Sequence, residues 1–176
     1  MVCSMITLLH NWNRESCEQV FQEAHSHWKI LYEPHPIPHH NDPTFNKHVD
    51  IDRFRVCVLN QEPLRKLLLD LNQTIEMFAG HPLKQISAGV VRWDPGTFMA
   101  PHVDNPAGWF RDYAAIVYLN DNFEGGVFEF TNLELQIKPK QGHALMFSCD
   151  QQRHGVSEIT AGVRYTLSCW YQKTKR

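Results

Sequence analysis

Hydrophobic residues recur at helical spacing in two segments of the N-terminal half of the chain. In the first segment, from Asn13 to Trp28, the apolar positions are Cys17, Val20, Phe21, Ala24 and Trp28. In the second, which Pro63 opens and which ends near Gly80, they are Leu64, Leu67, Leu68, Leu71, Ile75 and Phe78. Asn13 is a candidate N-cap, and proline is favoured in the first turn of a helix. We therefore predict two amphipathic helices, each packing one face on a core.

The pattern changes after His81 to short β-type runs separated by Pro-Gly, Gly-Gly and Gln-Gly turns. The predicted strands are 85–93, 113–119, 127–130, 133–138, 143–148 and 163–171. The proline-rich stretch 33–48 is expected to be irregular. Many short strands predict a mainly β fold with N-terminal helices, either a jelly roll or a closed double-sheet barrel. We expect a single domain over 1–176, with a helical part of about 1–80 and a β core of about 81–172.

The last predicted strand has two different faces, because alternate side chains of a strand point to opposite sides. One face is apolar and carries Val163, Tyr165, Leu167, Cys169 and Tyr171. The other carries Arg164, Thr166 and Ser168. The polar face either meets solvent or lines a pocket, and the pattern alone leaves both open.

Composition narrows the classes of partner and compartment. The formal net charge is −2 and the pI is about 6.6, so the overall balance implies no nucleic-acid partner. No apolar run approaches the length of a membrane span. The apolar start, Met1 to His10, lacks the basic region and cleavage site of a signal peptide. The five cysteines include no Cys-x-x-Cys pair, which favours free thiols in a reducing compartment and thus a cytoplasmic location.

Candidate metal chemistry lies in the C-terminal half. His102 and Asp104 form a His-x-Asp triplet, His154 follows much later, and Arg164 comes after it. Two imidazoles and one carboxylate can occupy one face of an octahedral Fe(II) and leave three positions open. An arginine fork can pair with the far carboxylate of a chelating co-substrate.

A His-x-Asp triplet is weak by itself, because the chain has eleven histidines and two further triplets at 40–42 and 48–50. The triplet at 48–50, followed by His102 and Arg111, even reproduces the wider spacing. Those two triplets lie in a stretch rich in proline and asparagine, whereas His102 follows a strand-like run and a turn. A metal site needs ligands on a rigid scaffold, which favours His102 and Asp104.

The ordered motifs resemble those of a known family. They are His102-Val-Asp-Asn-Pro, Arg111-Asp-Tyr through Tyr118-Leu-Asn, Gly125-Gly-Val-Phe-Glu-Phe, His154-Gly-Val, and Arg164-Tyr-Thr with Trp170. Together they are similar to the Fe(II)- and 2-oxoglutarate-dependent dioxygenases over about residues 85 to 171. Within that superfamily they look most like the prolyl hydroxylases, both the leprecan-type prolyl 3-hydroxylases and the oxygen-sensing prolyl 4-hydroxylases.

The resemblance implies a fold and a set of roles. The fold is a double-stranded β-helix, a cupin-like jelly roll buttressed by helices. Iron would be held by His102, Asp104 and His154, and O2 and 2-oxoglutarate would be co-substrates, with ascorbate as a candidate reductant. The 2-oxoglutarate carboxylate would meet Arg164 and the Tyr118 hydroxyl, helped by Thr166 or Ser168.

The sequence departs from the family pattern at two places. Collagen 4-hydroxylases usually have lysine at the position of Arg164. A tyrosine near the co-substrate in the oxygen-sensing enzymes falls here at about Trp93, which has no hydroxyl. Trp93 is therefore given no hydrogen bond to the co-substrate.

The expected reaction is hydroxylation of an unactivated C–H bond, with release of succinate and CO2, on a prolyl residue of a peptide or protein. Trp109, Phe110 and Arg111 are candidate substrate contacts, because aromatic rings can stack on proline. The two aromatics could instead pack their own loop. A free amino acid or other small molecule is the alternative substrate. A jelly-roll zinc enzyme and a non-catalytic binding module are the alternatives of other classes.

Overall fold

The computed structural model describes residues 6–31, 54–57, 62–104, 111–150 and 152–174. Its helices are α1 (Arg14–Leu31) and α3 (Glu62–Ala79). The first six strands are β1 (Ile6–Leu9), β2 (Phe54–Cys57), β3 (Leu83–Trp93), β4 (Met99–His102), β5 (Tyr113–Tyr118) and β6 (Glu124–Gly125). The others are β7 (Phe128–Phe130), β8 (Leu135–Ile137), β9 (Ala144–Ser148), β10 (His154–Val156), β11 (Ile159–Ala161) and β12 (Arg164–Lys173).

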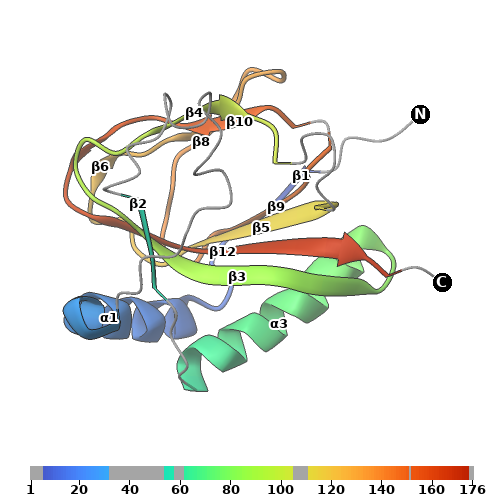
Figure 1. The fold of residues 1–176 in the computed structure, drawn as a ribbon, viewed down its shortest axis with the longest axis horizontal. Coiled ribbons are helices and arrows are strands. Elements are labelled where there is room, and N and C mark those ends of the chain that lie inside the picture. The colour runs from blue at the N-terminus through green and yellow to red at the C-terminus, as the bar shows by residue number, and fades with distance from the viewer. Residues whose placement is uncertain (1–5, 32–53, 58–61, 105–110, 151, 175–176) are drawn as a thin grey trace.

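The described strands form three antiparallel sheets. The largest has the order β1-β9-β5-β12-β3-β2, the second has the order β4-β10-β7-β8, and β11 pairs with β6. Both helices cover one face of the six-stranded sheet, and the four-stranded sheet lies over its other face (Figure 1). This confirms the predicted mainly β fold of two facing sheets buttressed by helices.

Both helices form where the apolar spacing predicts them. In α3 the buried residues are Leu64, Leu67, Leu71 and Ile75, and in α1 they include Cys17, Val20, Phe21 and Ala24. The backbone carbonyl of Asn13 accepts the first helical bond of α1, from the Cys17 amide at 3.0 Å. The Asn13 side chain reaches instead to Asp70 of α3, donating to its carboxylate at 2.7 Å. Asn13 thus joins the start of one helix to the middle of the other.

Strand β12 separates two cores. Its odd-numbered side chains from Tyr165 to Tyr171 pack in a cluster with both helices. Arg164, Thr166 and Ser168 alternate with them and are also buried, at 1%, 0% and 7% exposure. The polar face of β12 therefore lies between the two sheets, which removes the solvent-facing alternative.

The six predicted strands correspond to β3, β5, β7, β8, β9 and β12. The remaining strands are two to four residues long and were not predicted. The irregular stretch predicted at 33–48 lies outside the described residues.

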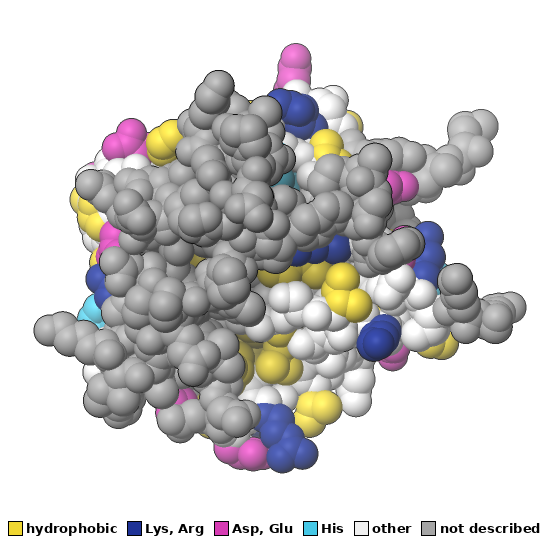
Figure 2. All heavy atoms as spheres, viewed as in Figure 1, with side chains coloured by type: hydrophobic (Ala, Val, Ile, Leu, Met, Phe, Trp, Pro, Cys, Tyr) yellow, Lys and Arg dark blue, Asp and Glu magenta, His cyan; other side chains and the backbone are white. Residues whose placement is uncertain are grey.

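Neither described helix is both long and apolar enough to cross a membrane. On the face shown in Figure 2, basic side chains stand in separate places, several beside acidic ones.

Candidate functional site

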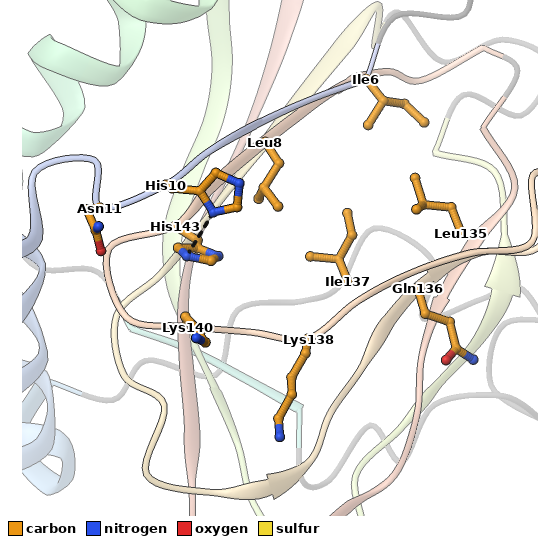
Figure 3. Close-up of a pocket in the computed structure, with 10 residues that line it drawn as sticks. All are labelled: Ile6, Leu8, His10, Asn11, Leu135, Gln136, Ile137, Lys138, Lys140 and His143. Atoms are coloured by element: carbon orange, nitrogen blue, oxygen red, sulfur yellow. Dashed lines mark hydrogen bonds between the residues drawn. The ribbon is translucent and has the colours of Figure 1, made fainter.

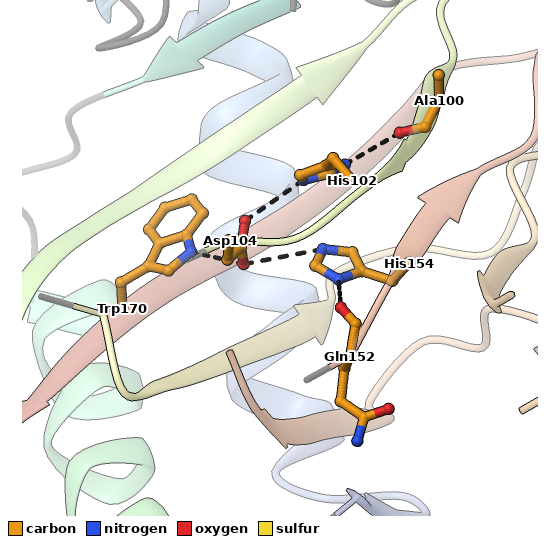
Figure 4. Close-up of polar contacts among 6 residues, drawn as sticks. All are labelled: Ala100, His102, Asp104, Gln152, His154 and Trp170. Atoms are coloured by element: carbon orange, nitrogen blue, oxygen red, sulfur yellow. Dashed lines mark hydrogen bonds and ion pairs between the residues drawn. The ribbon is translucent and has the colours of Figure 1, made fainter. Parts of the chain in front are cut away.

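His102 and His154 lie opposite each other on two paired strands. They are register partners of β4 and β10, with ring centroids 4.5 Å apart. Asp104 lies two residues beyond the end of β4, and one ligand atom from each of the three residues lies within 4.8 Å of the other two. The structure therefore brings together the three side chains that the sequence singled out (Figure 4).

Backbone carbonyls fix the orientation of both imidazoles. Nδ1 of His102 lies 3.0 Å from the carbonyl of Ala100, and Nδ1 of His154 lies 2.9 Å from the carbonyl of Gln152. Because a carbonyl only accepts, each Nδ1 carries the proton and donates it. Each Nε2 then presents its lone pair toward Asp104, which is the tautomer that a metal-binding histidine needs.

The Asp104 carboxylate sits between the two imidazoles and is 7% exposed. Its Oδ1 is 3.3 Å from Nε2 of His102, and its Oδ2 is 3.8 Å from Nε2 of His154. Metal–ligand bonds of about 2.1 Å at right angles place neighbouring ligand atoms about 3 Å apart. The three residues thus fit a six-coordinate cation bound on one face.

The charges of the three residues are coupled. Burial by itself would raise the pKa of Asp104, but the neighbouring His154 and His102 hold that pKa well below its usual value. Burial lowers the pKa of His154. It also acts to lower the pKa of His102, but the hydrogen bond and charge of Asp104 outweigh it and raise that pKa. Near neutral pH the site therefore keeps an anionic carboxylate, which a cation requires.

Aromatic rings shield one side of the site. The His154 ring stacks on Phe128, with centroids 5.1 Å apart and planes 14° apart. Phe147 contacts the same imidazole edge-on at 4.8 Å. His154 is 3% exposed as a result. These rings hold the imidazole plane in place and exclude water from its far side.

Arg164 is buried in an aromatic setting without a carboxylate partner among the described residues. Its guanidinium carbon lies 4.8 Å from the Trp93 ring centre and 5.4 Å from that of Tyr118. Burial lowers the pKa of Arg164 to about 10, with Tyr118 acting in the opposite direction. Within the described part of the chain, Nε and Nη1 of Arg164 and the hydroxyl of Tyr118 are buried and lack a hydrogen-bond partner.

These unpaired atoms indicate an anion-binding position. A buried cation is costly unless it is paired, and three unsatisfied donors at one place are the arrangement that a carboxylate satisfies. The surface alternative for Arg164, pairing with Glu129 or Glu158, is not found among the described ion pairs. Arg164 at 1% exposure is not a surface residue.

Thr166 and Ser168 continue the same polar face. Thr166 is the register partner of Tyr118 on β5, and its hydroxyl accepts a hydrogen bond from the Trp93 indole at 3.3 Å. The hydroxyls of Thr166 and Ser168 are 3.5 Å apart. The structure thus places Trp93 as a wall of this position, with its indole N–H directed to Thr166.

Of the three candidate substrate contacts, only Arg111 lies among the described residues. Trp109 and Phe110 lie outside the described residues. Arg111 is described and is half-buried, with its guanidinium carbon 4.7 Å from the ring centre of Trp170. Sequence reasoning gave Trp170 no role, yet its indole donates to Asp104 Oδ2 at 2.9 Å.

A separate groove of about 710 Å³ lies between β1 and β8 (Figure 3). Its lining residues are Ile6, Leu8, His10, Asn11, Leu135, Gln136, Ile137, Lys138, Lys140 and His143. It holds a close imidazole pair, His10 Nδ1 and His143 Nε2, 3.3 Å apart. None of the three candidate metal ligands lines this groove.

The fold and the site define a class of protein. Residues 88–172 match the sequence profile of the 2OG-Fe(II) oxygenase superfamily. This span includes all three candidate ligands and Arg164. Over this span, just under half of the chain, the sequence is similar to that superfamily.

Similar curated proteins include prolyl 3-hydroxylases. Over 72 residues the chain is 43% identical to prolyl 3-hydroxylase 2 of Rattus norvegicus and to prolyl 3-hydroxylase 1 of Gallus gallus. Each match covers 38% of this chain and 10% of the relative, so the chain spans only about a tenth of these relatives.

Two solved structures share the whole fold. A prolyl-4-hydroxylase from Pseudomonas putida aligns with a TM-score of 0.75 at 15% identity, covering 98% of this chain and 95% of that one. A prolyl hydroxylase from Trichoplax adhaerens, solved with a hypoxia inducible factor peptide fragment, aligns with a TM-score of 0.76 at 17% identity. That alignment covers 96% of this chain and 83% of the other. Members of this superfamily have a double-stranded β-helix core, which the two facing sheets here form.

Proposed function

We propose that this chain is an Fe(II)- and 2-oxoglutarate-dependent dioxygenase that hydroxylates an unactivated C–H bond. Its substrate would be a prolyl residue of a peptide or protein, and O2 would be consumed with release of succinate and CO2. One observation carries the proposal. Three ligand atoms that fit one face of a cation lie between the same two sheets as a buried, unpaired Arg164.

The three ligands would each contribute one atom. Nε2 of His102, Nε2 of His154 and one carboxylate oxygen of Asp104 would hold Fe(II) and leave three positions for the keto acid and O2. When bound, the iron supplies the oxidising chemistry, which no amino-acid side chain can provide. The protein binds and orients the reactants, and the aromatic wall around His154 excludes water.

Arg164 would bind the far carboxylate of 2-oxoglutarate. Its guanidinium is a fixed cation whose planar donors match a carboxylate, and its Nε and Nη1 are both buried without a hydrogen-bond partner among the described residues. Burial raises the pKa of Tyr118 to about 12, so its hydroxyl stays protonated and can also donate a hydrogen bond. Thr166 and Ser168 would support the same end of the co-substrate through their hydroxyls.

A peptidyl proline is the favoured substrate because the similar proteins are prolyl hydroxylases and one of them was solved with a bound peptide. Trp109, Phe110 and Arg111 remain the candidate substrate contacts. Their segment starts beside Asp104 and ends at Arg111, and Arg111 stacks on Trp170 next to the metal site. A free amino acid is the second candidate, which the same site chemistry would serve.

The alternatives of other classes explain less of the structure. A zinc enzyme could use the same three ligands, but the buried unpaired Arg164 would have no purpose there. A non-catalytic module need not keep all three ligands. Three free, buried cysteines, Cys17, Cys149 and Cys169, support our inference of a reducing compartment such as the cytoplasm. Ascorbate remains a candidate reductant.

The test is an anaerobic titration of the purified protein with Fe(II) and then 2-oxoglutarate. We expect the visible charge-transfer band of an iron-bound keto acid, and its loss in His102→Ala and His154→Ala. His143→Ala is the matched control, because His143 is also buried but lies in the separate groove. A folded, iron-loaded protein without the band would overturn the proposal. Succinate release with a proline-containing peptide, compared with free proline, then decides the substrate class.

A further inference from the structure

Trp170 contacts two groups at the edge of the candidate metal site. Its indole Nε1 donates to Asp104 Oδ2 at 2.9 Å, and the guanidinium carbon of Arg111 lies 4.7 Å from its ring centre. We propose that Trp170 is a positioning residue that determines which oxygen of Asp104 faces the metal, and that Arg111 holds the indole in that orientation. The inference rests on the metal site of the proposed function.

The distances distinguish the two carboxylate oxygens. Oδ1 is 3.3 Å from Nε2 of His102, close to the separation of about 3 Å expected for neighbouring ligand atoms. Oδ2 is engaged by the indole and lies farther from the imidazole on its side, at 3.8 Å from Nε2 of His154. Oδ1 would therefore be the oxygen that coordinates a bound metal, and the indole would hold Oδ2 away from it.

This division matters for the number of open positions. A carboxylate can bind a metal through one oxygen or through both. The terminal torsion of an aspartate is broad, so without the indole the carboxylate of Asp104 could turn and bring Oδ2 to the metal. Binding through both oxygens would occupy one of the three positions that the keto acid and O2 need. The hydrogen bond from Trp170 keeps Asp104 a single-atom ligand.

Arg111 restrains the indole through its ring face. A guanidinium within about 6 Å of an indole centre is attracted to the ring face, and more strongly where water is excluded. Burial lowers the pKa of Arg111, and Asp104 acts to raise it, so the cation also senses the same carboxylate. Asp104 and Arg111 flank the stretch 105–110 in the sequence, and both contact Trp170. The Trp170 side chain thus links the Asp104 carboxylate to Arg111.

A substitution can separate this role from simple packing. Trp170→Phe keeps an aromatic ring for Arg111 but removes the N–H. Trp170→His places a ring nitrogen at the position of the indole nitrogen and so restores a donor. Trp93→Phe is the matched control, because Trp93 lies on the adjacent strand and its indole N–H donates to Thr166 instead of to a ligand.

The test uses Co(II) as the probe, because its visible spectrum reports coordination without turnover. In Trp170→Phe we expect Co(II) affinity to fall by about tenfold to a hundredfold, as for other lost partners of metal ligands, with a changed spectrum. Trp170→His should recover most of the affinity, and Trp93→Phe should match the wild type. Wild-type affinity and spectrum in a folded Trp170→Phe protein would overturn the inference. No Co(II) binding by the wild type would instead refute the metal site, and the inference with it.

Arg111→Met provides a second, independent test of whether Arg111 acts through Trp170, because it leaves the indole intact. Removing a nearby cation favours metal binding electrostatically, whereas releasing the indole disfavours it. We expect weaker Co(II) binding in Arg111→Met, and no further loss when it is added to Trp170→Phe. Stronger binding in Arg111→Met, or full additivity of the two substitutions, would show that Arg111 does not act through Trp170.

Discussion

Gly126 lies where an added methyl group would reach Arg164. Its φ is +63°, and a Cβ there would be 2.6 Å from Cδ1 of Ile159 and 3.0 Å from Cδ of Arg164. It would also be 3.1 Å from a ring carbon of Phe123. We predict that Gly126→Ala destabilises the protein and weakens binding of 2-oxoglutarate, because the stem of Arg164 must move.

Gly80 supplies a matched control for the magnitude. Its φ is +72°, and a Cβ there meets nothing within 4 Å. A non-glycine residue in this left-handed conformation costs about 1–2 kcal/mol, which both variants share. Crowding in a packed interior adds about 1–3 kcal/mol at Gly126 alone. Gly126→Ala should therefore lower the free energy of unfolding by about 2–5 kcal/mol, and Gly80→Ala by about 1–2 kcal/mol.

Two measurements check the reasoning. Urea denaturation gives the loss of stability, and the charge-transfer band of the iron-loaded protein gives the affinity for 2-oxoglutarate. Gly80→Ala should bind 2-oxoglutarate like the wild type, whereas Gly126→Ala should bind it more weakly. If both variants lost the same stability and both kept wild-type affinity, the position of Arg164 would not depend on Gly126, and the argument would be refuted.

Three further outcomes are expected. Asn120→Ala should lower the free energy of unfolding by about 2–5 kcal/mol in urea denaturation. The Asn120 side chain hydrogen-bonds the Tyr165 N–H and the Val163 carbonyl, each at 2.7 Å, and the substitution leaves both groups without that partner. A loss below about 1 kcal/mol would contradict this expectation. Burial lowers the pKa of His143 below 6.5, so the unfolded chain binds more protons and stability falls as pH drops below about 6.5. His143→Gln should flatten that fall in denaturation curves, and an unchanged slope would count against it. Burial raises the pKa of Cys17 to about 12, so a thiol reagent at pH 8 should label Cys17 only after unfolding, as mass spectrometry of its peptide would show.

The helices and long strands could be predicted because their signals are local. Each turn of α3 contributes a buried leucine or isoleucine, and β12 alternates over its whole length. The sequence left open whether the polar face of β12 meets water. The exposure of this face depends on which elements cover the strand. Strand β12 pairs with both β3 and β5 and lies under the four-stranded sheet, so the polar face is buried.

The candidate ligands were found by residue type and order, but their surroundings were not. Strands β4 and β10 are four and three residues long, too short to show a period, and they include Pro101 and Gly155. Their pairing nevertheless sets His102 opposite His154. The carbonyls that orient both imidazoles belong to the backbone, so no residue type marks them. Trp170 stands among the family motifs and on the Arg164 face, two residues beyond Ser168, but nothing in the sequence marks its indole as the partner of Asp104.

The two faces of β12 also constrain how this protein can be altered. Helix-facing and site-facing side chains alternate along one strand. Inserting or deleting a single residue after Arg164 would therefore send Thr166 toward the helices and Tyr165 or Leu167 toward the candidate metal site. Both the core and the site would be lost in one step. Changes in the length of β12 are tolerable only in the flanking turns or in steps of two residues. A designer who wishes to reshape the candidate co-substrate position must therefore substitute residues of β12 and keep its length.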